Sequence, residues 1–308
     1  MTNRNTGWIR VLLLCAMLAL GLCACTASAD GGITTWEELR TALSAGGTVT
    51  LTEDITAGPT DSAITIPKNI TVTLNLNGCT LSRGLTEPTS SGNVINVNGT
   101  LTITGSGTIT GGNTTGVGGG IWVKAGGNCT LNGGLISGNH ANDNGGGVYV
   151  SGSGASFTLI SGAIENNTGK NGGGIANVDT GTVSIQSGNI TGNSASNNGG
   201  GVWFSQGYVP NTMAGGSITG NTAGASGGGV YMNKGTFEIT GGSITNNTAP
   251  TGANAAVNQK EGSDAEILYS VTIDSAFVHG TVSADKEFAS AEETVTLAVT
   301  PDLGWRIV

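Results

Sequence analysis

Carboxylate side chains are the first candidates for chemistry in this chain. Paired carboxylates hydrolyse glycosidic bonds, and clustered carboxylates bind calcium. Residues 101–260 contain no arginine, and they contain four carboxylates: Asp143, Glu165, Asp179 and Glu238. These four fall at different positions of the repeat described below, so no two are expected to converge. The sequence therefore predicts no catalytic residue, no metal site and no cofactor.

Two histidines and one charge pair complete the set of titratable candidates. His140 and His279 stand alone in the sequence and are predicted to be surface side chains. Asp143 lies two residues before a glycine triplet, and Lys170 takes the same place one repeat later. The pair is predicted to form an exposed ion pair between neighbouring coils, which contributes little to stability.

Aromatic residues give a stronger signal, because four of them occupy one position of the repeat. They are Trp122, Tyr149, Trp203 and Tyr231. Ala176 interrupts this series. If the apolar residues on either side point inward, strand alternation turns the aromatic rings outward. Such a stripe suits sugar rings or a partner protein. The alternative is that the rings only stack on one another and shield the strands.

The element that must position these residues is a repeat of about 27 residues. Its first motif is a glycine triplet followed by Ile or Val, and the triplets begin at Gly118, Gly145, Gly172, Gly199 and Gly227. A second motif, Ile-x-x-Asn, runs half a repeat out of phase. A degraded sixth copy, residues 254–257, is predicted to place Val257 in line with Val230. A fixed period of this length is typical of a solenoid.

Three apolar columns follow if residues one period apart lie over one another, as in a right-handed parallel β-helix. Successive coils would then be about 4.8 Å apart. The columns contain Ile121, Leu131 and Ile136 and their equivalents in later repeats. The second motif also predicts a ladder of stacked amides. Its members are Asn139, Asn167, Asn193, Asn221 and Asn247.

The two ends of the array differ from its middle. Thr35 and Glu38 form a capping-box pattern that predicts a short helix over the open end of the solenoid. Period-two strands from Thr48 onward supply the first coils. After Gly262 the periodicity ends, and the tail is predicted to be a small β module. The predicted domains are residues 1–29, 30–262 and 263–308.

Residues 1–29 have the pattern of a secretory signal, with Arg4 and Arg10 before an apolar core and a small-x-small cleavage site. The alternative is lipoprotein processing at Cys25, which would give the only predicted membrane attachment. Cys79 and Cys129 would remain in the mature chain, and two separate buried thiols are expected rather than a disulfide.

The amino-acid composition argues against nucleic acid as a partner. Glycine makes up 55 of 308 residues, and 10% of residues are charged. Removal of Arg4 and Arg10 with the leader leaves 9 basic against 20 acidic residues, a net charge of −11. An acidic surface disfavours nucleic acid, which needs a basic footprint. We expect a monomer.

The two motifs resemble the GGA[ILV] and FxxN repeats of chlamydial polymorphic membrane proteins. More broadly, residues 36–257 resemble right-handed parallel β-helix surface proteins of bacteria. The tail, residues 279–306, resembles the divergent internalin-type B repeat of bacterial surface proteins. The resemblance implies an all-β, pectate-lyase-like solenoid that is secreted or displayed on a cell surface, often as an adhesin.

These observations predict a non-enzymatic surface protein that binds a glycan or a partner protein. The alternative is a polysaccharide lyase or glycoside hydrolase, since the same fold hosts both enzyme classes. A third hypothesis is ice binding by a column of threonines, Thr191, Thr219 and Thr245. Glu165 interrupts that column, which weakens this third hypothesis.

Overall fold

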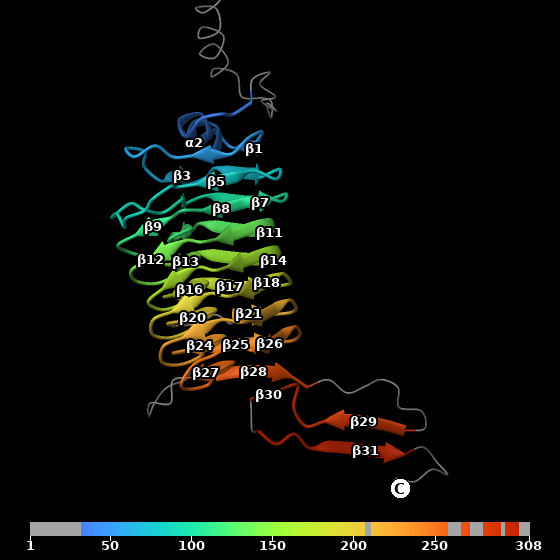
Figure 1. Cartoon of the computed structure of the whole chain (residues 1–308). Coiled ribbons are helices and arrows are strands. Elements are labelled where there is room, and N and C mark those ends of the chain that lie inside the picture. Colours follow the sequence, from blue (N-terminus) through green and yellow to red (C-terminus); the bar gives the residue numbers. More distant parts are fainter. Residues whose placement is uncertain (1–31, 207–210, 258–265, 272–279, 291–292, 302–308) are drawn as a thin grey trace, which may run out of the picture.

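The chain folds into a parallel β-solenoid with one short helix at its N-terminal end (Figure 1). The computed structural model describes residues 32–206, 211–257, 266–271, 280–290 and 293–301. The predicted all-β parallel fold is confirmed. The leader, Cys25 and His279 lie outside the described residues.

Sheet B is an eight-stranded parallel sheet formed by the strands that follow the glycines. Its strands are β3 (Ile64–Ile66), β6 (Ile95–Val97), β10 (Ile121–Val123), β13 (Val148–Ser151), β16 (Ile175–Val178), β20 (Val202–Phe204), β24 (Val230–Met232) and β27 (Ala255–Val257). In β27, Ala255 is paired with Val230 and Val257 with Met232. The predicted alignment of Val257 with Val230 was therefore wrong by two residues, because the last turn is shorter than those before it.

Sheet A forms the other two strand positions of each coil. Its first segment contains β1 (Gly47–Thr50), β4 (Thr71–Asn75), β7 (Thr100–Thr104), β11 (Asn128–Ser137), β14 (Ser156–Glu165), β17 (Thr182–Ile185), β21 (Asn211–Met213), β25 (Thr236–Ile239) and β28 (Glu266–Ser270). Its second segment contains β2 (Ile55–Thr56), β5 (Thr80–Ser82), β8 (Thr108–Thr110), β18 (Asn189–Thr191), β22 (Ser217–Thr219) and β26 (Ser243–Thr245). The ten-residue strands β11 and β14 run through both segments and join them.

Sheet C is a short parallel sheet that the sequence pattern did not predict. Its strands are β9 (Asn113–Thr114), β12 (His140–Ala141), β15 (Thr168–Gly169), β19 (Ser194–Ala195) and β23 (Thr222–Ala223). Strands β12, β15, β19 and β23 each follow directly after an asparagine of the predicted ladder, whereas β9 follows Gly112. Their inward residues are Ala, Gly or Thr, and they are buried. Small side chains leave room for the glycine triplets, which run close beside this sheet.

The triplets are glycine because three surfaces meet there. At Gly199 φ is +66°, and a side chain would lie 2.8 Å from the Cβ of Trp203. At Gly200 a Cβ would lie 2.4 Å from the backbone carbonyl oxygen of Thr222 in sheet C. At Gly201 it would lie 2.6 Å from the carbonyl oxygen of Gly229 in the next coil. The motif therefore folds the chain tightly between sheet C and sheet B.

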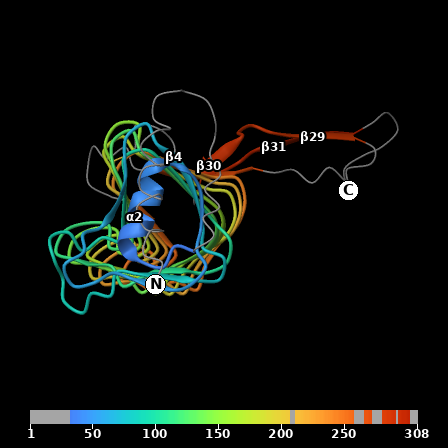
Figure 2. The ribbon, with the colours of Figure 1, turned by 90° about the horizontal axis from the view of Figure 1, so that it is seen from above.

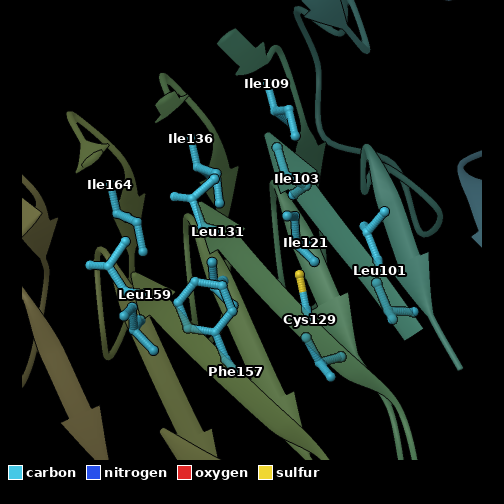
Figure 3. Packing of buried hydrophobic residues seen from close by; sticks show 14 of the residues in the cluster. Leu101, Ile103, Ile109, Ile121, Cys129, Leu131, Ile136, Phe157, Leu159 and Ile164 are labelled. Atoms are coloured by element: carbon cyan, nitrogen blue, oxygen red, sulfur yellow. The ribbon is translucent and has the colours of Figure 1, made fainter. Parts of the chain in front are cut away.

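The core contains the three predicted columns and further apolar ones. Figure 3 shows two of the predicted columns and a third apolar row that was not predicted, side by side along the solenoid. In it Leu101, Cys129 and Phe157 form one row, Ile103, Leu131 and Leu159 a second, and Ile109, Ile136 and Ile164 a third. These side chains are at most 1% exposed. Because each coil buries its apolar residues against its neighbours, the stacking itself forms the core.

Helix α2 (Trp36–Ala45) covers the N-terminal end, as the view along the axis shows (Figure 2). Both hydrogen bonds of the predicted capping box between Thr35 and Glu38 are present. Trp36 is buried and its indole N–H donates to the carbonyl of Ser62 at 2.9 Å. The guanidinium of Arg83 lies over the indole ring, 5.7 Å from its centroid. The helix thus seals the first coil with its apolar face.

At the other end, β28 is parallel to β25 and extends sheet A. Strand β30 (Phe288–Ser290) then adds antiparallel to β28. Strands β29 (Gly280–Ala284) and β31 (Leu297–Pro301) form a separate two-stranded antiparallel sheet beside the end of the solenoid. This is the small C-terminal β element that the loss of periodicity predicted.

Candidate functional site

The predicted aromatic residues lie on the outer face of sheet B. Trp122 is paired with Tyr149, and Trp203 is paired with Tyr231. All four are partly exposed, while the residues on either side of each ring are buried. At about 4.8 Å per coil, the stripe is about 19 Å long from Trp122 to Tyr231. We call these four residues the aromatic stripe.

The first half of the stripe is packed internally. The rings of Trp122 and Tyr149 meet edge to face, with centroids 6.1 Å apart. The ammonium of Lys124 lies over the Trp122 ring, 4.1 Å from its centroid. The Trp122 indole N–H donates to the hydroxyl of Ser151 at 3.1 Å. These contacts match the alternative hypothesis, in which the rings shield the strands.

The second half of the stripe differs. Ala176 separates it from the first half, and this alanine is fully buried. Trp203 and Tyr231 are adjacent in register, yet among the described residues neither side chain forms a hydrogen bond, a ring contact or a cation contact. The two halves of the stripe therefore differ in their side-chain contacts, since the Trp122 ring has partners.

The electrostatics keep the stripe neutral. Burial raises the pKa of Tyr149, and the nearby carboxylates of Asp179 and Asp143 raise it further. A hydrogen bond with the side chain of Ser151 lowers the pKa, but by less than these effects raise it. Burial also raises the pKa of Tyr231. Burial lowers the pKa of Lys124. Both phenols therefore stay protonated at pH values above the usual pKa of tyrosine, and each can donate a hydrogen bond.

The asparagine column forms the predicted ladder at the buried corner between sheets A and C. The Asn193 side-chain amide donates to the side-chain oxygen of Asn221 at 2.9 Å and to the carbonyl of Ile164 at 2.9 Å. The backbone N–H and side-chain amide of Asn167 both donate to the side-chain oxygen of Asn193. The same pattern joins Asn139 to Asn167 and Asn221 to Asn247, and Asn254 ends it. These residues are structural and are not open to a ligand.

Two of the carboxylates predicted to lie apart, Glu165 and Glu238, are on different segments of sheet A, whereas Asp143 and Asp179 both lie near the phenol of Tyr149. Glu165 lies on the second segment of sheet A, in line with Ser137 and Thr191, whereas Glu238 lies on the first segment beside Thr212. Asp143 and Lys170 are joined through their backbones, not through the predicted side-chain ion pair.

Other titratable residues have structural partners. His140 is partly buried, and its ring nitrogens lie 2.6 Å from the hydroxyl of Thr168 and 2.8 Å from the side-chain oxygen of Asn142. Cys79 and Cys129 are free thiols, as predicted, although Cys79 is only half-buried. Within the described residues, no group of three or more His, Cys, Asp or Glu side chains could hold a metal ion. No described helix is long and apolar enough to cross a membrane.

Comparison of the chain with protein-family models, with curated proteins and with solved structures returns no match, so the functional argument starts from the fold and its surfaces.

Proposed function

We propose that this protein is an extracellular, non-enzymatic β-solenoid that binds a glycan through the aromatic stripe of sheet B. The observation that supports the proposal is the pair Trp203 and Tyr231, whose outward rings have no partner among the residues that the structure describes. A tryptophan and a tyrosine on adjacent coils present apolar ring surface and polar N–H and O–H groups together. This combination suits sugar rings, which have apolar faces and hydroxyl edges.

The solenoid preorganises this surface. Val202, Phe204, Val230 and Met232 flank the two rings along the strands and are fully buried. The backbone that carries the two rings is therefore held in place by its neighbours, so binding has to order only the two ring side chains. Trp203 and Tyr231 lie one coil step of about 4.8 Å apart, so the proposed ligand places one or two of its sugar rings on this pair.

A glycan array tests the proposal. The chain should bind a subset of glycans, and a variant with Trp203→Ala and Tyr231→Ala should lose that binding. The matched control is Thr191→Ala with Thr219→Ala, two neighbouring outward residues on another face. Equal binding by the aromatic variant and the wild-type chain would contradict the proposal.

Enzymatic turnover would contradict the non-enzymatic part of the proposal. Incubation with uronate polymers, followed by ultraviolet absorbance for unsaturated uronate and by a reducing-end assay, should give no signal above that of the heated protein. A signal that survives purification to homogeneity would establish the alternative, a polysaccharide lyase or hydrolase.

The proposal of secretion or surface display is based on the signal-like pattern of residues 1–29. Fractionation of cells that express the full chain should place the protein outside the cytoplasm. Metabolic labelling with a palmitate analogue distinguishes the two processing routes, because only a chain lipidated at Cys25 takes up label and loses it in a Cys25→Ser variant.

A further inference from the structure

The outer face of the first segment of sheet A is covered by hydroxyl groups. At its central position seven consecutive coils place a hydroxyl side chain in register: Thr48, Thr73, Thr102, Thr130, Thr158, Ser184 and Thr212. All seven are partly or fully exposed. Glu238, on the next strand, is the first charged residue in this column. We call this surface the hydroxyl face.

Two further columns flank the central one and make it a grid. Two residues earlier on each strand lie Thr71, Thr100, Asn128, Ser156 and Thr182. Two residues later lie Thr50, Asn75, Thr104 and Asn132. Points on the grid are about 4.8 Å apart between coils and about 6.6 Å apart along a strand. The flanking columns are also uncharged.

Four of the seven central hydroxyls are free to bind a ligand, whereas Thr212 donates to the hydroxyl of Ser184 at 3.2 Å. Thr73, Thr102, Thr130 and Thr158 form no side-chain hydrogen bond with any residue that the structure describes. By contrast, hydroxyls beside them bond along the columns, as Ser156 does to Asn128 and Ser161 to Asn132. Half-exposed hydroxyls without a protein partner must bond to water or to a bound molecule.

The grid is rigid as well as regular. Leu74, Ile103, Leu131 and Leu159 follow the four central threonines along their strands and are fully buried. A threonine side chain on a strand also has restricted rotation about its first bond. The hydroxyl and methyl positions of the grid are therefore fixed by the stacking of the coils.

We propose that the hydroxyl face binds ice. Both repeats of the grid are close to those of the oxygen lattice of hexagonal ice, so adjacent hydroxyls can occupy or bond to neighbouring lattice positions. The methyl groups hold the intervening water in cages, and over the seven coils before Glu238 no charged group of the central column imposes its own hydration shell. A protein partner would instead need several large apolar or charged side chains, and the described residues on the seven coils of this face present one, Ile160, which is 36% exposed.

The threonine column considered from the sequence does not make such a grid. Thr191, Thr219 and Thr245 belong to the second segment of sheet A, and Glu165 precedes them in the same column. The column two residues before it contains Leu135 and Ala163 in two coils, and Asn189, Ser217 and Ser243 beside the three threonines. From Glu165 onward the polar part of that face spans three coils, and the charge of Glu165 separates it from the earlier coils.

Ice recrystallisation inhibition and thermal hysteresis of the full chain test the proposal. The wild-type chain should slow the coarsening of ice grains and lower the freezing point below the melting point. A Thr130→Tyr variant should lose most of both effects, because its ring projects from the centre of the grid. Tyrosine is favoured in strands, so the fold should remain.

The control is Thr219→Tyr, the same change on the second segment, which should keep both activities. The circular dichroism spectrum and the melting temperature establish that each variant is folded. A folded wild-type chain with neither activity would overturn the proposal, and so would equal activity in the Thr130→Tyr variant. The result is independent of glycan binding, since the aromatic stripe lies on sheet B.

Discussion

Asn193 illustrates what one side chain contributes to the solenoid. It joins three coils through bonds to Asn167, Asn221 and Ile164, all in a buried corner. An Asn193→Ala change leaves the N–H of Asn167 and the carbonyl of Ile164 without these partners. Since each unsatisfied buried group costs about 1–3 kcal/mol, we expect a loss of about 3 kcal/mol in the free energy of unfolding.

Urea unfolding followed by circular dichroism measures this loss. Thr191→Ala is the matched control, because Thr191 lies two residues before Asn193 and points outward. The control should stay within about 0.5 kcal/mol of the wild type. Equal midpoints for the two variants would show that the ladder contributes nothing to stability.

Cys129 gives the fold a predictable response to alkaline pH. Burial raises the pKa of its thiol from 9.0 to about 12. Between these values the unfolded chain loses the proton and the folded chain keeps it, so stability falls as pH rises. The slope from this one group is up to about 1.4 kcal/mol per pH unit.

A Cys129→Val variant should remove that contribution, because valine fills a similar volume and does not ionise. Unfolding free energies at pH 8 and pH 11 should therefore fall less in the variant than in the wild type. The tyrosines with raised pKa, such as Tyr149 and Tyr231, are common to both proteins and cancel in the difference. An identical fall in both proteins would show that Cys129 does not titrate in this way.

Among the elements, the glycine triplet is the one whose composition is most tightly constrained. A Cβ at Gly201 would lie 2.6 Å from the carbonyl oxygen of Gly229 and 2.9 Å from the side chain of Ile218. Gly201→Ala should therefore force two coils apart, at a cost of about 3 kcal/mol. At Gly116 the nearest atom would be 3.8 Å away, so Gly116→Ala should be close to neutral. Melting temperatures compare the two, and a harmless Gly201→Ala would contradict this packing.

The capping helix is the element that keeps the first coil covered. Thr35→Ala removes the hydroxyl that accepts from the N–H of Glu38 at 3.2 Å. The loss should be about 1 kcal/mol, and hydrogen exchange should speed up first in residues 36–45. The control Thr41→Ala, at an exposed position in the same helix, should not change exchange there. Faster exchange spread evenly over all coils would contradict a local cap.

An element can be predicted from the sequence when its residues form a clear periodic pattern. The columns at Ile121, Leu131 and Ile136 are large and periodic, so the stacking can be deduced from spacing alone. Sheet C is two residues wide and its inward residues, such as Ala195, are too small to give a hydrophobic pattern. The alignment of Val257 failed because the last turn differs in length from the regular repeat.

At the scale of the whole molecule, the surfaces are less predictable than the core. Sequence alternation places all four aromatic residues outward. It cannot show that Lys124 and Tyr149 contact the Trp122 ring, whereas no described side chain contacts the Trp203 ring in this way. Likewise, Thr130 is an ordinary strand residue until the register aligns it with Thr102 and Thr158. Side-chain contacts and register across coils depend on turn lengths, which spacing alone does not determine.

Two faces of one rigid solenoid therefore have different chemistry. Sheet B presents aromatic rings, and the first segment of sheet A presents an uncharged grid of hydroxyls. Since the two surfaces belong to separate sheets, changes to one should leave the other intact. This independence makes the aromatic variants and the threonine variants controls for each other.

The equilibrium dissociation constant of the best glycan from the array, measured for single variants, is the most direct test of the central claim. Trp203→Ala should weaken binding at least about tenfold, or about 1.4 kcal/mol. Trp122→Ala should change it far less, because that ring is already packed against Lys124 and Tyr149. Unchanged affinity in Trp203→Ala, with both variants folded, would contradict a glycan-binding role for the stripe.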